Sequence, residues 1–113
     1  MLNHKQENGI DILSFKDINK LNILIAQSLK EEVAQFITKP NTKLILDMKH
    51  IEYVDSSGFG ALLSILRNAK NNDSELKLSN ISDDVLELVK LLQLHNVFEI
   101  YKSTEEAIIG FSE

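Results

Sequence analysis

The sequence has no cysteine, and this absence removes several classes of protein. Without thiols there is no disulfide framework, no thiolate zinc site and no cysteine nucleophile. Long apolar runs are also missing, because the longest unbroken one, Ile23 to Ala26, is far too short to span a membrane. The first eight residues lack the apolar segment of a secretory signal. We therefore expect a cytoplasmic protein with no membrane insertion.

Positive charge is scarce as well. Twelve basic residues stand against 17 acidic ones, the formal net charge is −5, and Arg67 is the single arginine. A protein that binds the backbone of nucleic acids needs clustered basic side chains, and no such cluster is visible. We therefore expect no direct contact with nucleic acid.

What is present is enough for one globular domain. The chain has 113 residues, of which 43% are hydrophobic and 26% charged. A chain of this length buries roughly two-thirds of its unfolded surface, so it folds without disulfides or metals. We interpret the polar residues 1–8 as a flexible N-terminal tail and residues 9–113 as the domain.

Apolar periodicity predicts strands and helices in alternation. Strands are expected over residues 9–15, 43–48, 76–78 and 97–101, and helices over 23–38, 56–71, from Ser82 to about Leu92, and from Ser103 to the end. Such alternation is typical of an α/β domain, here with a mixed but largely parallel sheet of four or five strands and about four helices. Six apolar side chains are expected in the core: Leu62, Leu63, Leu66, Val85, Leu88 and Leu92.

The informative segment runs from Asp55 to Gly60, between a predicted strand and an apolar helix. Ser56 falls at the N-cap or in the first turn, where free backbone amides and the helix dipole favour negative charge. Gly58 and Gly60 each cost a helix about 1 kcal/mol relative to alanine. Either another surface must approach this backbone closely, or the helix packs tightly on the sheet. A serine cap with small packing residues is the plain alternative.

The stretch Val54–Gly60, preceded by the apolar strand at 44–48, resembles the STAS domain and especially the anti-sigma factor antagonists. The resemblance extends over nearly the whole chain. It implies that Ser56 is a phosphorylation site, with Ser57 as the second choice. It also implies an anti-sigma factor with serine kinase activity as partner. That partner binds the unmodified protein, releases the sigma factor, and lets go once Ser56 is phosphorylated. A serine phosphatase resets the cycle.

The same resemblance implies regulation by binding, with no catalysis, cofactor or metal. The expected partner-binding residues are Asp55, Ser57, Gly58, Phe59, Gly60, Asn19 and Asn22. Here the chain departs from the family, whose Gly-x-Leu-Asp motif corresponds to residues 19–22. Asparagine replaces both the glycine and the aspartate; it tolerates a left-handed backbone but lacks the charge. A binding subunit that is never phosphorylated, in a stressosome-like scaffold or a lipid-transport complex, is therefore the alternative.

Enzymatic functions fit less well. A serine hydrolase needs glycines two residues before and after its nucleophile, and Val54 occupies the first position. His50 and His95 are available as bases, but neither has an orienting partner in the sequence. A metal site built from Asp47, His50 and Asp55 is conceivable, although such aspartates are usually solvated or capping. The phosphate-binding loop of nucleotide hydrolases is absent.

Overall fold

The computed structural model of the protein describes residues 1–112 and contains a mixed sheet of five strands in the order β1-β2-β4-β6-β7. The strands are β1 (Leu2–Glu7), β2 (Ile10–Phe15), β4 (Lys43–Asp47), β6 (Glu75–Ser79) and β7 (Glu99–Tyr101). Strand β1 pairs antiparallel with β2, and the remaining neighbours pair in parallel. A separate two-stranded parallel ladder joins β3 (Lys20–Leu21) to β5 (Tyr53–Val54).

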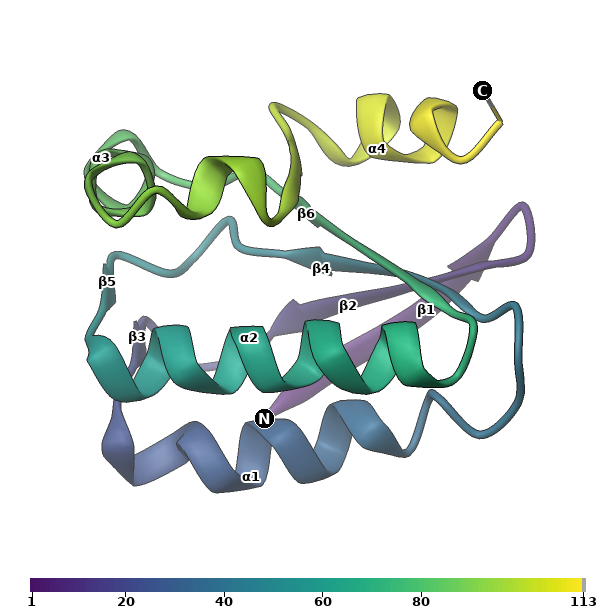
Figure 1. Ribbon diagram of the computed structural model, residues 1–113, viewed down its shortest axis with the longest axis horizontal. Coiled ribbons are helices and arrows are strands. Elements are labelled where there is room, and N and C mark those ends of the chain that lie inside the picture. The colour runs from purple at the N-terminus through teal and green to yellow at the C-terminus, as the bar shows by residue number, and fades with distance from the viewer. Residues whose placement is uncertain (113) are drawn as a thin grey trace.

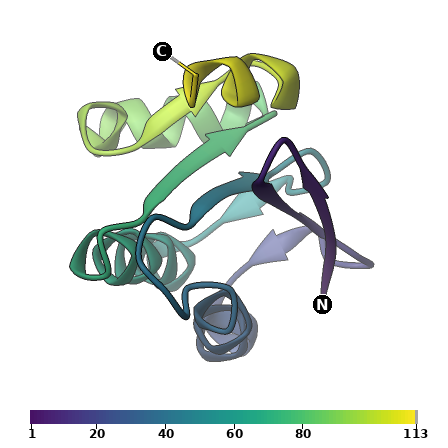
Figure 2. The same cartoon turned by 90° about the vertical axis from the view of Figure 1, so that its right-hand side faces the viewer.

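Four α-helices and one short 3₁₀ helix surround the strands of the described part of the chain. They are α1 (Ile23–Ala34), α2 (Ser56–Asn71), α3 (Asp83–Leu91), η1 (Leu94–Asn96) and α4 (Thr104–Gly110). Figure 1 shows α1 and α2 side by side on one face of the sheet, and Figure 2 shows α4 over the other. The predicted α/β architecture, mixed sheet and number of helices are confirmed.

The two faces of the sheet carry separate apolar cores. Along β4, Leu44 and Leu46 join the main core with α1 and α2, whereas Ile45 joins a smaller cluster with Ala107 and Ile108 of α4. This division follows from the alternation of side chains along a strand. The main core is larger, so it holds α2 and the segment before it firmly in place.

The interpretation of residues 1–8 as a flexible tail is wrong. Strand β1 pairs with β2 along its whole length, from Leu2 opposite Phe15 to Glu7 opposite Ile10. Its side chains are mostly exposed, so it shows no apolar alternation. The missed signal is Asn8-Gly9, whose positive φ angles of 55° and 76° suit the two-residue turn of a hairpin.

Two further expectations need correction. Helix α1 ends at Ala34 rather than near Thr38, because the amides of Gln35, Phe36 and Ile37 bond three residues back instead of four. Apolar spacing persists through these tight turns, which made the helix look longer.

Leu92 is exposed, and Val89 occupies the core position of α3, whereas Leu62, Leu66 and Val85 are buried and Leu63 and Leu88 half-buried.

The face under α4 contains a buried lysine. Lys77 of β6 is almost fully enclosed, and its Nζ donates a hydrogen bond to Glu99 Oε1 at 2.9 Å. The ammonium also lies 4.5 Å from the centre of the Phe111 ring and 3.4 Å from the Tyr101 hydroxyl. Burial alone would lower the pKa of Lys77, but the bonds to Glu99 and Tyr101 outweigh it and raise that pKa above its ordinary value.

Candidate functional site

The candidate site lies where β5 runs into α2. Asp55 is the N-cap of α2, and its Oδ1 accepts a hydrogen bond from the Gly58 amide at 2.9 Å. Ser56 is therefore the first residue of the helix and not its cap. The Ser56 side chain is exposed and that of Ser57 half-buried, so the two serines are not equally accessible. This difference favours Ser56 as the residue that another protein can reach.

The loop formed by residues 19–22 lies directly beside this helix start. The Leu21 carbonyl accepts a bond from the Asp55 amide at 3.0 Å, and Leu21 is paired with Val54 in the β3–β5 ladder. The Asn19 carbonyl accepts from the Glu52 amide at 2.8 Å. The two segments, far apart in the sequence and predicted together as one partner surface, are thus brought to one end of the molecule.

The two asparagines of this loop have different roles. Asn22 is the N-cap of α1, and its Oδ1 accepts a bond from the Leu24 amide at 3.0 Å. Asparagine caps a helix about as well as aspartate, so the cap survives the substitution. The nearby residue with a left-handed backbone is Asp17, two positions before the loop, with a φ of 57°, and not Asn19. Asn19 instead donates through Nδ2 to Glu52 Oε2 at 3.3 Å.

The glycines of the motif differ sharply. A Cβ on Gly58 would lie 2.3 Å from the Leu21 carbonyl oxygen, so close packing of α2 against β3 requires glycine there. A Cβ on Gly60 would meet nothing within 4 Å. Phe59 is buried in the main core. Gly58 and Phe59, expected to contact a partner, therefore serve the interior, while Gly60 lies open on the surface.

The charge around the site is unusual for an acidic chain. Neither α1 nor α2 has an acidic residue in its first turn, and both begin at the same end of the molecule (Figure 1). Asp55 is the nearest carboxylate by sequence, and one of its oxygens is bonded to the Gly58 amide. Two positive helix ends thus meet here: that of α2 is capped by the Asp55 carboxylate, and neither helix has a carboxylate within its first turn.

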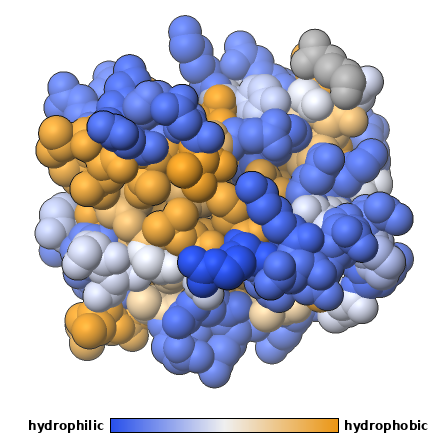
Figure 3. Space-filling view, viewed as in Figure 1, coloured by the Kyte–Doolittle hydropathy of each residue, from blue (hydrophilic) through white to orange (hydrophobic). Residues whose placement is uncertain are grey.

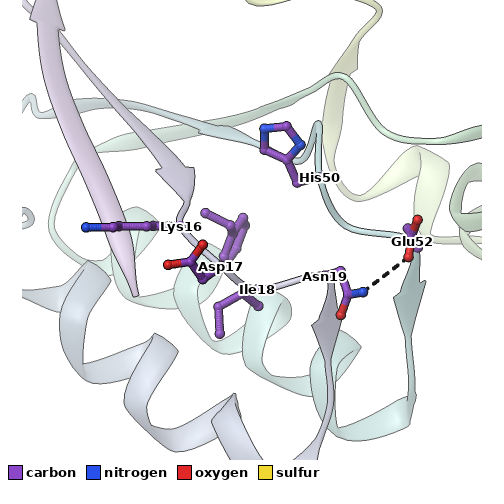
Figure 4. A pocket seen from close by; sticks show the side chains of 7 residues that line it. Lys16, Asp17, Ile18, Asn19, His50 and Glu52 are labelled. Atoms are coloured by element: carbon purple, nitrogen blue, oxygen red, sulfur yellow. Dashed lines mark hydrogen bonds between the residues drawn. The ribbon is translucent and has the colours of Figure 1, made fainter.

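A shallow pocket of about 650 Å³ adjoins the loop. Figure 4 shows Lys16, Asp17, Asn19, His50 and Glu52 around it, with His50 and Glu52 on the segment that leads into β5. His50 and Glu52 were not predicted as neighbours of Asn19, because 30 or more residues separate them from Asn19 in the sequence and only the fold brings them together. The pocket is open and holds mixed charges, so by itself it indicates no ligand.

The geometry does not favour the enzymatic alternatives. Within residues 1–112, Ser56 has no hydrogen bond to a histidine, and no cluster of three potential metal ligands occurs. Asp47 Oδ1 accepts instead from the Lys49 amide and from Asn80 Nδ2, both at 3.0 Å. No helix of this described part is both long and apolar enough to cross a membrane.

Comparison with known proteins agrees on one family. The family model described as STAS domain matches residues 3–107. An anti-sigma-B factor antagonist of Listeria monocytogenes is 25% identical over 105 residues, which cover 93% of this chain and 91% of that protein. The crystal structure of a proposed anti-sigma factor antagonist from Thermotoga maritima, also 25% identical, has a TM-score of 0.87 and covers 99% of this chain and 95% of its own.

A more distant structure shares the fold. It is the anti-sigma factor antagonist SpoIIAA in its unphosphorylated form, 17% identical, with a TM-score of 0.67 over 99% of this chain and 97% of that chain. At this identity the likeness concerns the fold alone. The three proteins are matched over nearly their full lengths.

Proposed function

The chain belongs to the STAS domain family, and we propose that it acts as an anti-sigma factor antagonist. In its unmodified form it binds an anti-sigma factor, and the sigma factor is set free. The anti-sigma factor is also a serine kinase that phosphorylates Ser56 and thereby ends the complex, and a serine phosphatase restores the unmodified form. The protein acts by binding and not by catalysis, and it controls sigma-factor-dependent transcription.

The observation that carries this proposal is the position of Ser56. Its side chain is exposed at the first position of α2, whose first turn has no acidic residue. A phosphate there adds about −1.5 to −2 charges and three acceptor oxygens. The helix dipole and the free amides of the first turn favour that charge. Phosphorylation should therefore leave the fold intact.

The effect of phosphorylation then falls on the partner. A partner surface that packs around the neutral Ser56 hydroxyl removes the water that surrounds this hydroxyl. The same surface cannot take up a dianion without a new cation opposite it, because an unpaired buried charge is very costly. Release follows from electrostatics and desolvation at the contact, with no change in the shape of the antagonist.

Gly60 supports a close contact at this face. It lies four residues after Ser56, hence on the same side of the helix, and has open space where a side chain would lie. Internal packing does not explain glycine at this position, although it does explain Gly58. A partner backbone that passes close to α2 would require the small residue.

The alternative is a subunit that binds permanently and is never phosphorylated. The observation that favours it is Asn22, which keeps the helix cap but lacks the family's negative charge. Introducing Asn22→Asp separates the two functions. If the charge serves phosphorylation, this variant is phosphorylated faster than the wild type while its stability changes little. A permanent subunit remains unmodified with either residue.

The test uses each candidate anti-sigma factor of the source organism, purified singly and mixed with this protein and ATP. Trypsin releases residues 50–67 as one peptide that contains Ser56 and Ser57. We expect one candidate to bind, and mass spectrometry to place phosphate on Ser56. Ser56→Ala should bind permanently and Ser56→Asp weakly, whereas Ser57→Ala should still be phosphorylated on Ser56. A Ser56→Asp variant that binds as tightly as the wild type contradicts the mechanism.

A further inference from the structure

Two large aliphatic side chains near Ser56 are largely exposed to solvent. Ile23 is 73% exposed and Leu24 86% exposed, and they are the first two residues of α1. Figure 3 shows an apolar cluster at the lower left, where α1 begins in Figure 1. Single exposed leucines are common on proteins, but two adjacent and nearly complete exposures next to a candidate site need an explanation.

The fold itself gives no reason for these residues. The buried positions of α1 are Leu29 and Val33, six and ten residues after Ile23. Asn22 already caps the helix, and acidic or polar residues suit the first turn better than aliphatic ones. Polar side chains at positions 23 and 24 would leave the core unchanged, so the apolar pair serves something outside the molecule.

Backbone contacts fix the pair close to the phosphorylation site. Leu21, two residues before Ile23, accepts the bond from the Asp55 amide at 3.0 Å, and Asp55 directly precedes Ser56. In the same ladder, Lys20 is paired with Tyr53, whose side chain is 50% exposed. Ile23 and Leu24 at the start of α1, together with Tyr53 of the neighbouring strand β5, are here called the α1 tip. They thus continue the surface on which Ser56 lies.

Charge indicates what the α1 tip would fit. The first turns of α1 and α2 contain no acidic side chain, and α1 begins with the neutral cap Asn22, so the positive end of α1 lies directly beside these apolar groups without a carboxylate cap. A complementary partner presents an apolar recess with acidic side chains at its border. A second copy of this chain suits the surface poorly, because the same positive ends would face each other in a symmetric pair.

We infer that Ile23 and Leu24, supported by Tyr53, are the apolar anchor by which the anti-sigma factor is held beside Ser56. This inference rests on the proposed function and adds to it the residues that supply affinity. The anchor and the switch are then separate: the α1 tip provides contact area that phosphorylation does not alter, and Ser56 decides whether that contact is permitted.

The test compares two pairs of substitutions with the same chemistry. The first is Ile23→Gln with Leu24→Gln. The control is Leu91→Gln with Leu92→Gln, at the end of α3, where the side chains are 78% and 53% exposed. All four positions are at the surface, so both variants should fold, which circular dichroism and thermal melting verify. Binding to each purified anti-sigma factor candidate is measured by titration calorimetry.

We expect the α1 tip variant to lose about 30-fold or more in affinity, the size of an interface hot spot, with the control close to wild type. Equal affinity of the α1 tip variant and the wild type overturns the anchor but leaves the proposed function standing. Loss of affinity only in the Leu91 and Leu92 variant also overturns it and places the contact on α3. If the wild type binds no candidate, the anchor and the proposed function both fail.

Discussion

Helices α1 and α2 begin differently from α3 and α4, although all four are capped in the same way. A side-chain oxygen accepts a backbone amide hydrogen at each start, from Asn22, Asp55, Ser82 and Ser103 respectively. The first turn of α3 then contains Asp83 and Asp84, and that of α4 contains Glu105 and Glu106. The first turns of α1 and α2 contain no acid at all.

The first turns of α3 and α4 serve helix stability, whereas those of α1 and α2 remain available to another negative group. Each acid in a first turn stabilises a helix by about 0.3–1 kcal/mol, and this chain has 17 acidic residues to place. At α3 and α4 that stabilisation is used. At α1 and α2 no first-turn acid provides it. Apart from the Asp55 cap, the first turn of α2 therefore remains free for a negative group that is added and removed. A phosphate on Ser56 is such a group under the proposed function.

The largest effect is expected from alanine at the two glycines of α2. Gly58→Ala places a Cβ against the Leu21 carbonyl, so α2 must move away from β3, and we expect a loss of about 3 kcal/mol in the free energy of unfolding. Gly60→Ala fills open space and should stabilise by roughly 0.5–1 kcal/mol. Urea denaturation measures both. Similar values for the two variants would contradict the assignment of Gly58 to packing and Gly60 to the surface.

Removing the cap of α2 should have the next largest effect. Asp55→Ala deprives the Gly58 amide of its acceptor, and we expect a loss of roughly 1–2 kcal/mol in the free energy of unfolding. Asp55→Asn keeps an acceptor oxygen and should lose only a few tenths. Thermal melting of the pair separates capping from charge. A large loss in Asp55→Asn would show that the carboxylate charge is needed and that the site is less free of charge than we describe.

A pH titration contrasts the Ser56 end of the molecule with the sheet face under α4, where the charged Lys77 is buried. The pKa of Lys77 is raised above its ordinary value of 10.5, so the charged lysine stabilises the folded state. That contribution is complete below pH 10.5 and is lost as pH rises through the higher folded-state pKa. Lys77→Met should remove this component, worth about 1 kcal/mol because Glu99 is exposed. Identical alkaline unfolding curves for both proteins would contradict it.

Exchanging first-turn charge between the two kinds of helix should have the smallest effect. Ser56→Asp should stabilise by about 0.5 kcal/mol, and Asp83→Ser should destabilise by a similar amount. Both changes should shrink in high salt, which screens exposed charges. Denaturation at low and high ionic strength provides the measurement. Destabilisation by Ser56→Asp would mean that this end of the molecule does not tolerate negative charge.

Local signals in the sequence predicted much of this fold. Ser82 and Ser103 were expected at helix starts and are caps, and the short apolar run of β4 correctly predicted a buried strand. Strand β1 was missed because its stability lies in backbone pairing with β2, which leaves polar side chains outside. The pattern of polar and apolar side chains predicts which residues are buried. An edge strand with few buried side chains lacks such a pattern, so the hairpin turn beside it is the remaining sequence signal.

The site was predictable as a location but not residue by residue. The resemblance to the family implied that the 19–22 loop lies near Ser56, and the bond between the Asp55 amide and the Leu21 carbonyl brings the two segments together. No local rule separates Gly58 from Gly60, since the difference depends on where β3 passes. The exposure of Ile23 and Leu24 was not predicted either. They form the start of the longest apolar run, which suggests burial, yet both side chains face water.

The small size of the β3–β5 ladder has a consequence for watching the protein at work. Only two residue pairs hold it, and it is separate from the main sheet, so it should open more often than the core strands. The amides of Glu52 and Asp55 bond across it at 2.8 and 3.0 Å. Their rates of deuterium uptake should therefore slow when a partner covers this end and recover when it leaves, giving a built-in reporter of occupancy without any label.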